Sequence, residues 1–491
     1  MNIAFDNSYA RLPPAFYQRQ SPDPVGAPSL IVLNHELAAA LGLDVEFLSS
    51  ADGLNWLAGN RVLAGSEPLA MAYAGHQFGH FVPQLGDGRA LLVGEVIDGN
   101  GQRRDLHMKG SGPTPFSRGG DGRASIGPVV REYLASEAMA ALGVPTTRAL
   151  AAVATGETVF RQQPEPGGIL WRAAAGHVRV GTFEYFARRG QLEALRALAD
   201  HVIARHYPDL AEADNPALAL FDVVIDRTAA LVAHWMSIGF IHGVMNTDNT
   251  SVAGETIDYG PFGFLDSFDP NTCYSSIDRH GRYAWQRQPT IAHWNLARLG
   301  ECLLPLIDDD PQRALEHANS KLEAFPRRYQ NHFNPRLTAK IGLDARTPEH
   351  IALALDLLER MHRQQADFTL TFRRLAELDP RSGRDDAAVR ELFVDPDDFD
   401  AWAIEWRARL AVENRERNQF RAALQRVNPA FILRNHLAQR VADAAVERLD
   451  FEPLHTLLAV LARPYNDQPE HAELARPPRP EERVTETFCG T

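Results

Sequence analysis

The pattern of apolar and polar positions changes character along the chain. Between residues 85 and 110, two apolar runs flank the turn sequence Asp98-Gly99-Asn100-Gly101, which is a strong β-hairpin signal. Residues 128–142 then carry apolar side chains at helical spacing, with a proline in the first turn and a glycine after the last. Strand-like runs return at 149–162 and 167–174. The first half therefore predicts two strands, a helix and two more strands.

After about residue 190, long segments with helical spacing dominate as far as residue 461. The pattern predicts an α+β protein with two lobes, a small strand-rich one followed by a larger helical one. We divide the chain on this basis into an N-terminal extension (1–65), an N-lobe (66–188), a helical C-lobe (189–465) and an extended C-terminal arm rich in proline and charge (466–491).

Composition narrows the possible partners. The chain has 491 residues, of which 45% are hydrophobic and 23% charged, and a formal net charge of -13. Such a balance disfavours a surface for nucleic acid or anionic membranes, because that binding requires clustered Lys and Arg. No apolar run approaches the roughly 20 residues of a membrane span, and the first residues resemble neither a secretory signal nor a transit peptide. We therefore expect a cytoplasmic protein without nucleic-acid or membrane partners.

The most informative stretch is residues 242–249, His-Gly-Val-Met-Asn-Thr-Asp-Asn, followed by Asp258-Tyr259-Gly260. Protein kinases carry H-R-D-L-x-x-x-N, a short hairpin and D-F-G, in which the Asn and the second Asp hold magnesium. In this register Asn249 and Asp258 are the predicted metal ligands, and residues 251–257 are long enough for the hairpin. The position of the kinase base is Val244, which cannot accept a proton. A carboxylate stands nearby, at Asp248.

Upstream segments supply other parts of a kinase-like site in the expected order. Gly86, Gly88 and Arg89 open the first strand hairpin. The missing side chains of the two glycines allow backbone N–H groups to approach phosphates. Lys109 ends the second predicted strand, and Glu132 lies on the following helix, where it can hold that lysine in place. Each signal also fits an ordinary solvated charge or a flexible turn.

Two arginines and one turn complete the set of candidate nucleotide-binding residues. Arg172 and Arg179 come just after the last predicted strand of the N-lobe and can bind phosphate oxygens through their planar guanidinium groups. Ordinary salt bridges between the lobes are the alternative. Asp121-Gly122 is either another turn that faces the nucleotide or a flexible loop.

Several segments together resemble one family, the selenoprotein O family of protein adenylyltransferases. They are Y-A-G-H-Q-F-G at 73–79, L-G-D-G-R at 85–89, M-K-G-S-G-P-T-P-F-S-R at 108–118, H-G-V-M-N-T-D-N at 242–249 and N-P-A-F-I-L-R-N at 428–435. The resemblance implies a bilobal, protein-kinase-like fold that binds ATP in a flipped orientation and transfers AMP to hydroxyl groups of protein substrates. It also implies Mg²⁺ or Mn²⁺ as the metal and UTP as an alternative donor with manganese.

Applied to individual residues, the resemblance implies that Asp248 is the proton acceptor and that Asn249 and Asp258 bind the metal. Contacts to the nucleotide would come from the candidates already named, which are Gly86, Gly88, Arg89, Lys109, Asp121, Gly122, Arg172, Arg179 and Asp258. Family members are similar in carrying a selenocysteine or cysteine near the C-terminus, here Cys489, which we pair with Cys273 as a possible redox switch. A phosphate-transferring kinase and a non-catalytic nucleotide-binding scaffold remain as alternative functions.

Overall fold

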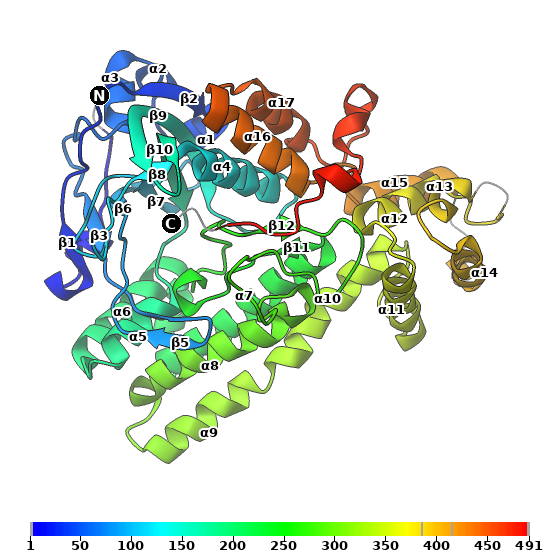
Figure 1. The fold of residues 1–491 in the computed structure, drawn as a ribbon. Coiled ribbons are helices and arrows are strands. Elements are labelled where there is room, and N and C mark those ends of the chain that lie inside the picture. Colours follow the sequence, from blue (N-terminus) through cyan, green and yellow to red (C-terminus); the bar gives the residue numbers. More distant parts are fainter. Residues whose placement is uncertain (1–2, 384–385, 414–415, 489–491) are drawn as a thin grey trace.

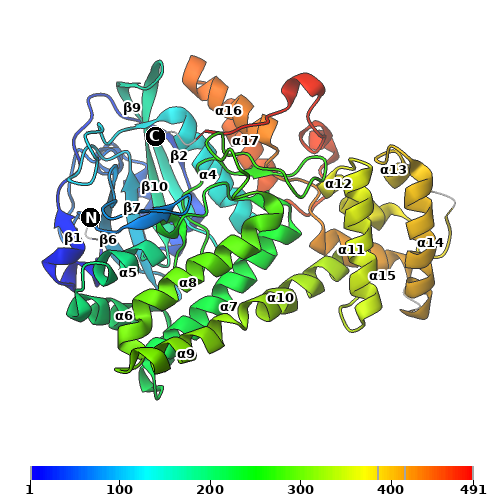
Figure 2. The same ribbon diagram turned by 60° about the horizontal axis from the view of Figure 1, so that its bottom comes forward.

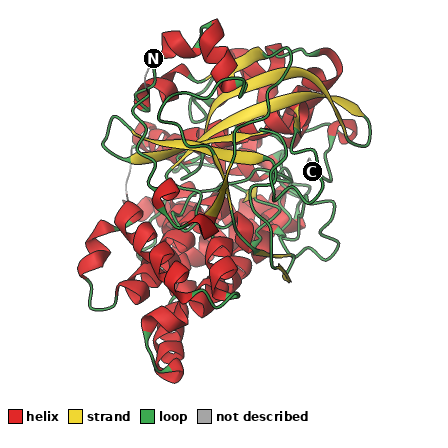
Figure 3. Ribbon diagram, turned by 90° about the vertical axis from the view of Figure 1, so that its left-hand side faces the viewer, coloured by secondary structure: helices red, strands yellow, loops and turns green. Residues whose placement is uncertain are grey.

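The computed structural model of this chain describes residues 3–383, 386–413 and 416–488. A twisted antiparallel sheet with its flanking helices forms one half, and a large group of helices forms the other (Figure 1). Figure 3 shows the long strands gathered in one half of the molecule and helices filling the other. This arrangement confirms the predicted α+β class and is consistent with a bilobal, kinase-like fold.

Among the described residues, the main sheet has eight strands in the order β1-β3-β6-β7-β10-β9-β2, with β8 paired to β10. The strands are β1 (Tyr17–Arg19), β2 (Ser29–Leu33), β3 (Leu69–Met71), β6 (Ala90–Ile97), β7 (Arg103–Lys109), β8 (Ala124–Ser125), β9 (Arg148–Phe160) and β10 (Pro164–Ala174). The predicted hairpin is β6–β7, whose turn is closed by Asp98 Oδ1 accepting the N–H groups of Asn100 and Gln102, both at 2.9 Å. Strands β1 and β2, from the first 65 residues, form the two ends of this sheet.

Helix α4 (Ile126–Ala141) is the predicted helix after the hairpin. Its apolar stripe is buried against β9 and β10, and the chain leaves it through Gly143 at φ +83°, a conformation that glycine adopts without strain. The opposite side of α4 is covered by α16 (Asn435–Arg448) and α17 (Glu452–Leu461), which lie beside it in Figures 1 and 2. The last long helices of the chain thus return to the strand-rich half.

The helical half is built on α7 (Pro216–Ser237), which packs against α8 (Gln288–Ile307) and α10 (Phe325–Lys340). The helices α5 (Val180–Ala187), α6 (Leu192–His206) and α9 (Pro311–Leu322) pack against α7 or α8. A further group projects to one side in Figure 2 and comprises α11 (Pro348–Arg363), α12 (Phe368–Arg374), α13 (Ala387–Arg390), α14 (Pro396–Glu413) and α15 (Arg417–Val427). Near the N-terminus, α1 (His35–Ala40), α2 (Val45–Leu48) and α3 (Ala51–Leu57) are short, and each is capped by a polar side chain.

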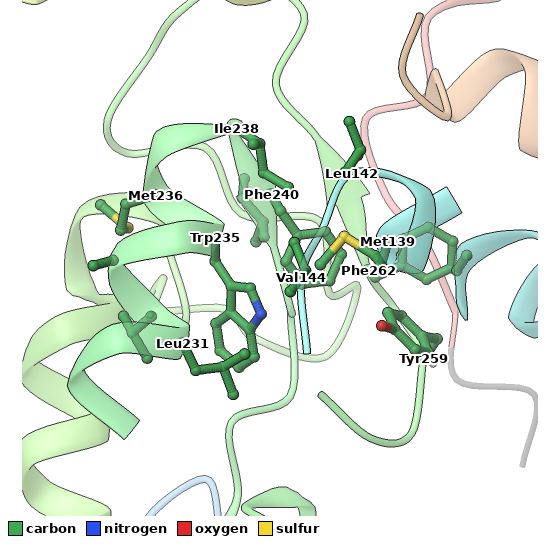
Figure 4. Packing of buried hydrophobic residues seen from close by; sticks show 14 of the residues in the cluster. Met139, Leu142, Val144, Leu231, Trp235, Met236, Ile238, Phe240, Tyr259 and Phe262 are labelled. Atoms are coloured by element: carbon green, nitrogen blue, oxygen red, sulfur yellow. The ribbon is translucent and has the colours of Figure 1, made fainter. Parts of the chain in front are cut away.

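An apolar cluster joins the two halves beneath the loops of residues 242–262. Figure 4 shows Met139 and Leu142 at the end of α4 together with Trp235 of α7, Phe240 and Phe262. The rings of Phe240 and Phe262 stack with centroids 6.2 Å apart. This packing fixes the chain after Asp258-Tyr259-Gly260. Strand β12 (Gly263–Phe264) follows that segment and pairs with β11 (Phe240–Ile241), which lies before residue 242.

The final described residues run back across the molecule. Beyond short 3₁₀ turns at Pro469–Leu474 and Pro480–Glu482, residues 466–488 contain no α-helix. Thr487 bridges to Ser275 in parallel, and its N–H donates to the carbonyl of Tyr274 at 2.6 Å. Within the described ranges, no helix combines the length and apolar character needed to cross a bilayer.

Candidate functional site

A cleft of about 750 Å³ lies between the sheet, α4 and the loop of residues 244–261. It is lined by every residue predicted to bind nucleotide or metal, to position the lysine or to accept a proton. These residues are Gly86, Gly88, Arg89, Lys109, Asp121, Gly122, Glu132, Arg172, Arg179, Asp248, Asn249 and Asp258. The structure therefore brings together groups that are up to 172 positions apart in the sequence, from 86 to 258.

Glu132 of α4 links two of the predicted cations. One of its carboxylate oxygens pairs with Lys109 Nζ, at the end of β7, and the other accepts from Arg172 Nη1 at 2.9 Å. The Glu132 side chain is almost completely buried, so neither interaction is weakened much by water. The predicted lysine-positioning contact is present. Arg172 lies on β10 itself rather than after it, where its backbone pairs with His107 of β7.

Asp258 is surrounded by positive charge. Arg172 Nη1 lies 2.6 Å from Oδ1, and Arg179 Nη2, from the residue before α5, lies 3.5 Å from Oδ2. Burial would raise the pKa of Asp258, but the charges of Arg172, Arg179 and Lys109 hold it well below its usual range. The residue has φ +60°, which is unusual for a side chain larger than glycine and is typical of constrained functional sites. Asp258 is therefore a carboxylate in this structure.

Asn249 ends the 3₁₀ turn Thr247–Asn249 and lines the same cleft as Asp258. Its Nδ2 donates to the carbonyl of Val244 at 3.0 Å, so its Oδ1 is the atom available to a cation. An amide oxygen and a charged carboxylate are the hard donors that Mg²⁺ and Mn²⁺ prefer. No group of three His, Cys, Asp or Glu side chains among the described residues has a metal-binding arrangement. Two protein ligands fit a magnesium site completed by water and phosphate oxygens.

The hairpin expected at residues 251–257 is not formed. Ser251 instead bridges to Arg179, and Thr256 bridges to Thr146 at the end of α4's connection to β9. The prediction was wrong because both ends of the segment find backbone partners distant in the sequence, at Arg179 and Thr146, which local spacing does not reveal. As a result, the loop between Asn249 and Asp258 is attached to the wall that carries Arg179.

Asp248 is nearly buried, with 7% of its surface exposed, and it lines the cleft. Burial raises its pKa to about 7, and a hydrogen bond from Gln77 Nε2 to Oδ2, at 3.2 Å, acts in the opposite direction. A carboxyl group with such a pKa can exchange a proton near neutral pH. Gly75 lies directly beneath it, because a Cβ atom at that position would come within 2.3 Å of Asp248 Oδ1.

Close packing is a second reason why positions 86 and 88 are glycine, beyond the access that they give to phosphates. A Cβ atom on Gly86 would come within 2.4 Å of the Phe116 ring, and one on Gly88 within 2.9 Å of the Phe116 carbonyl. Thr114 Oγ1 also donates to the carbonyl of Asp87 at 2.7 Å. The segment around Phe116 thus packs onto the glycine turn. Asp121 is held by Arg161 at 2.8 Å.

Comparison with known proteins decides the family. The sequence matches the family described as protein adenylyltransferase SelO over residues 1–462. This chain belongs to the SelO family. It is similar to a protein nucleotidyltransferase YdiU of Alkalilimnicola ehrlichii, with 60% identity over 487 residues that cover 99% of this chain and 98% of the relative. A protein of the same name from Bradyrhizobium sp. strain ORS 278 is 57% identical over the full length of both chains.

Membership of the SelO family confirms the resemblance found in the sequence motifs. It also identifies the protein as a nucleotidyltransferase, in preference to a phosphate-transferring kinase or a non-catalytic scaffold. The replacement of the kinase base by Val244 agrees with this distinction, since a side chain without a lone pair cannot orient or deprotonate a hydroxyl.

Sequence reasoning missed several residues of the SelO-family cleft. Tyr73 lies against the Arg179 guanidinium, 4.4 Å from its carbon to the ring centroid. Gln77 contacts Asp248, and Asp87 approaches both Arg179 and a buried histidine. Tyr73 and Gln77 belong to the motif at 73–79, and Asp87 to the motif at 85–89. The motifs could have drawn attention to these positions, but only the folded chain shows what they touch.

Of the predicted redox pair, the structure describes Cys273. Cys273 is half-buried and its Sγ donates to Asp278 Oδ2 at 3.2 Å. Burial and this carboxylate raise the pKa of the Cys273 thiol to about 12. Cys489 lies outside the described residues, so its pairing with Cys273 stays a prediction.

Proposed function

We propose that this protein transfers AMP from ATP to serine, threonine or tyrosine hydroxyl groups of protein substrates, with release of pyrophosphate and with Mg²⁺ or Mn²⁺ as the metal. The observation that carries the proposal is the grouping of Lys109, Arg172 and Arg179 around Asp258 in a cleft whose kinase-base position is Val244. Such a cleft is rich in cations for phosphates and has no carboxylate at the position of the kinase base.

The metal would be held by Asn249 and Asp258, and when bound it would neutralise charge on the phosphate oxygens. Lys109, Arg172 and Arg179, which surround Asp258, would serve the same purpose. Pyrophosphate carries more negative charge as it leaves than it did within ATP, so fixed cations stabilise the transition state more than the bound substrate. We assign Gly86, Gly88, Arg89, Asp121 and Gly122 to nucleotide binding on the basis of their place in the same cleft.

Asp248 is our proposed proton acceptor. The hydroxyl oxygen of the substrate forms a bond to the α-phosphorus, the bond from that phosphorus to the bridging oxygen of pyrophosphate breaks, and the hydroxyl proton moves to the carboxylate. The raised pKa of Asp248, about 7, suits a group that must hold this proton and then release it near neutral pH. Asp248 is therefore a better candidate than the kinase position occupied by Val244.

UTP is a second predicted donor when manganese is bound, because the residues named above would contact phosphates that ATP and UTP share. The acceptors are protein side chains, and we expect neither nucleic acid nor membranes among the partners. The cytoplasmic location inferred from the sequence stays a prediction.

Incubation with ATP labelled separately at the α- and γ-phosphates tests the proposal. We expect the α label, and not the γ label, to enter protein together with release of pyrophosphate. Incorporation of the γ label would instead establish a kinase, and the absence of both labels would favour a nucleotide-binding scaffold. Replacing Mg²⁺ by Mn²⁺ and ATP by UTP in the same assay determines the preferred metal and donor.

A further inference from the structure

A buried histidine lies directly behind Arg172. His107 is on β7, next to β10, and is fully buried, while Arg172 is 3% exposed. His107 Nδ1 lies 3.0 Å from Arg172 Nη2, and its Nε2 lies 3.3 Å from Asp87 Oδ2. The ring therefore stands between a carboxylate of the glycine turn and a guanidinium group of the cleft.

The direction of both hydrogen bonds follows from the chemistry of arginine. A guanidinium group has only N–H donors, so His107 Nδ1 must be the acceptor and must carry no proton. The ring proton is then on Nε2 and points to Asp87. Burial lowers the pKa of His107, and the nearby Asp87 charge opposes that effect without reversing it. A neutral ring with one donor and one acceptor satisfies both neighbours.

Asp87 is itself firmly held. The oxygen that accepts the hydrogen bond from His107 Nε2 also accepts one from the backbone N–H of Met71 at 3.1 Å, and only 3% of Asp87 is exposed. The backbone of Asp87 connects Gly86 to Gly88, and its other carboxylate oxygen lies 3.9 Å from Arg179 Nη2. The Asp87 carboxylate thus connects the glycine turn to Arg179 directly and to Arg172 through His107.

Arg172 depends on this connection for its orientation. Its Nη1 is shared between Glu132 and Asp258, and its Nε is buried without a hydrogen-bond partner among the described residues. The bond from Nη2 to His107 is then the contact that fixes the plane of the guanidinium group. Without it, the group could rotate about the Nη1 contacts, and a planar donor that rotates loses its match to phosphate oxygens.

The geometry points to Asp87 and His107 as positioning residues that orient Arg172 toward the phosphates of the nucleotide. The inference rests on the role of Arg172 in the proposed function. In this role both residues act through Arg172. The alternative is that His107 only fills the interior, where it stacks on His177 with ring centroids 4.3 Å apart.

Binding of ATP and of adenosine to three full-length variants separates these roles. His107→Leu removes both hydrogen bonds, whereas His107→Gln keeps one acceptor and one donor in the side chain. We expect His107→Leu to weaken binding of ATP with Mg²⁺ about ten-fold, the size of a lost bond to a charged group, and to leave adenosine binding unchanged. His107→Gln should restore most of the ATP affinity. Equal losses for ATP and adenosine, or failure of glutamine to rescue, would overturn the inference.

The third variant, Arg172→Met, tests the phosphate-binding role of Arg172 separately from the positioning role of His107. If Arg172→Met binds ATP normally, the phosphate-binding role of Arg172 is wrong. If it loses ATP affinity while His107→Leu does not, only the positioning role is wrong.

Selective ¹⁵N labelling of histidine in the unaltered protein gives a measurement that does not depend on folding of His107→Leu. The His107 signal, identified by its absence in His107→Gln, should show a proton on Nε2 at neutral pH, and a proton on Nδ1 would contradict the inference.

Discussion

At the scale of single residues, the cleft is a set of charges that depend on one another. Arg172 and Arg179 neutralise Asp258 in this structure, and Glu132 is shared between Arg172 and Lys109. A metal ion at Asp258 would compete with the two arginines for the same oxygens. Metal binding would then release guanidinium groups for the phosphates, so we expect metal and nucleotide to bind cooperatively.

Asp258→Ala should abolish metal-dependent nucleotidyl transfer, since that carboxylate is the charged member of the proposed ligand pair. Asn249→Ala should reduce the rate less, because it removes a neutral ligand. Steady-state rates at several Mg²⁺ and Mn²⁺ concentrations, with melting temperatures as a control for folding, measure both effects. Normal turnover by folded Asp258→Ala would exclude the metal assignment.

Asp248→Asn should bind ATP and metal nearly as well as the unaltered protein but transfer AMP at least 100-fold more slowly, the range typical of a lost general base. The amide keeps the size of the side chain and removes its ability to accept the proton. Equilibrium binding and single-turnover rates separate the two properties. Loss of ATP binding in this variant would indicate a role in metal or nucleotide binding instead.

Lys340 does not line the cleft, and its burial predicts how the stability of the protein depends on pH. It is 3% exposed, its Nζ lies 4.5 Å from the centroid of the Phe372 ring, and burial lowers its pKa to about 7. Between pH 7 and the unfolded value near 10.5, the unfolded chain binds more protons than the folded one, so stability rises with pH. From pH 7 to 9, the unfolding free energy of the unaltered protein should rise by about 1 kcal/mol per unit relative to Lys340→Met. Denaturant titrations at each pH measure it, and parallel curves for the two proteins would refute it.

At the scale of elements, a small ribbon shapes the loop of residues 246–249. Strands β4 (Gly75–Gln77) and β5 (His80–Val82) form a two-stranded sheet apart from the main one. Strand β4 and the turn after it bond to this loop. The His76 N–H donates to Thr247 Oγ1 at 2.6 Å, and the Phe78 N–H donates to Asn246 Oδ1 at 3.1 Å. Thr247 is also bound to the buried carboxylate of Glu184. The ribbon therefore acts as a template for the loop that carries Asp248.

Gly75→Ala tests this template with one methyl group. The new Cβ would come within 2.3 Å of Asp248 Oδ1, so the carboxylate must shift. Displacement of a catalytic group by about 1 Å can cost roughly 100-fold in rate, and we expect kcat to fall by at least ten-fold while KM for ATP changes little. Gly26→Ala is the matched control, because a Cβ there has its nearest neighbour at 4.0 Å. Equal rates for the two variants would show that Asp248 tolerates the shift.

The elements that the sequence predicted correctly are those with local signals. The turn at 98–101 and the helix before Gly143 are determined by residues within a few positions of one another. By contrast, the pairing of β2 with β9 joins residues more than 100 positions apart, and no spacing rule reveals it. The residues of the site divide in the same way, into those with a local sequence signal and those without one. Asn249 and Asp258 stand in a recognisable register, whereas the contacts of Gln77 and His107 exist only after folding.

At the scale of the whole molecule, the C-terminal segment reaches the loop that follows Asp258. Thr487 is hydrogen-bonded to Tyr274 and Ser276, and the exposed side chain of Phe488 lines the cleft. The C-terminal arm thus contributes directly to the mouth of the cleft, on the side where Cys273 lies.

We predict that oxidation joins Cys273 to Cys489 and slows transfer by fixing the arm at the cleft. In the chain-entropy model, closing a loop of this length would stabilise the oxidised form by roughly 5 kcal/mol. Peptide mapping without reductant should find the cross-link, and activity should rise when a thiol reductant is added. Cys273→Ser should lose both effects and Cys302→Ser neither. A rate that is independent of reductant would contradict the switch.

The position of α16 and α17 on α4 has a consequence for synthesis of the chain. Helix α4 is complete at residue 141, but the helices that cover its second face begin at residue 435. At about 5 to 20 residues per second, the ribosome needs roughly 15 to 60 seconds to make the intervening 300 or so residues. For that time the face of α4 that α16 and α17 cover lacks these partners, and apolar surface exposed during synthesis is prone to aggregation. Translation speed between these two helices should therefore influence the yield of folded protein.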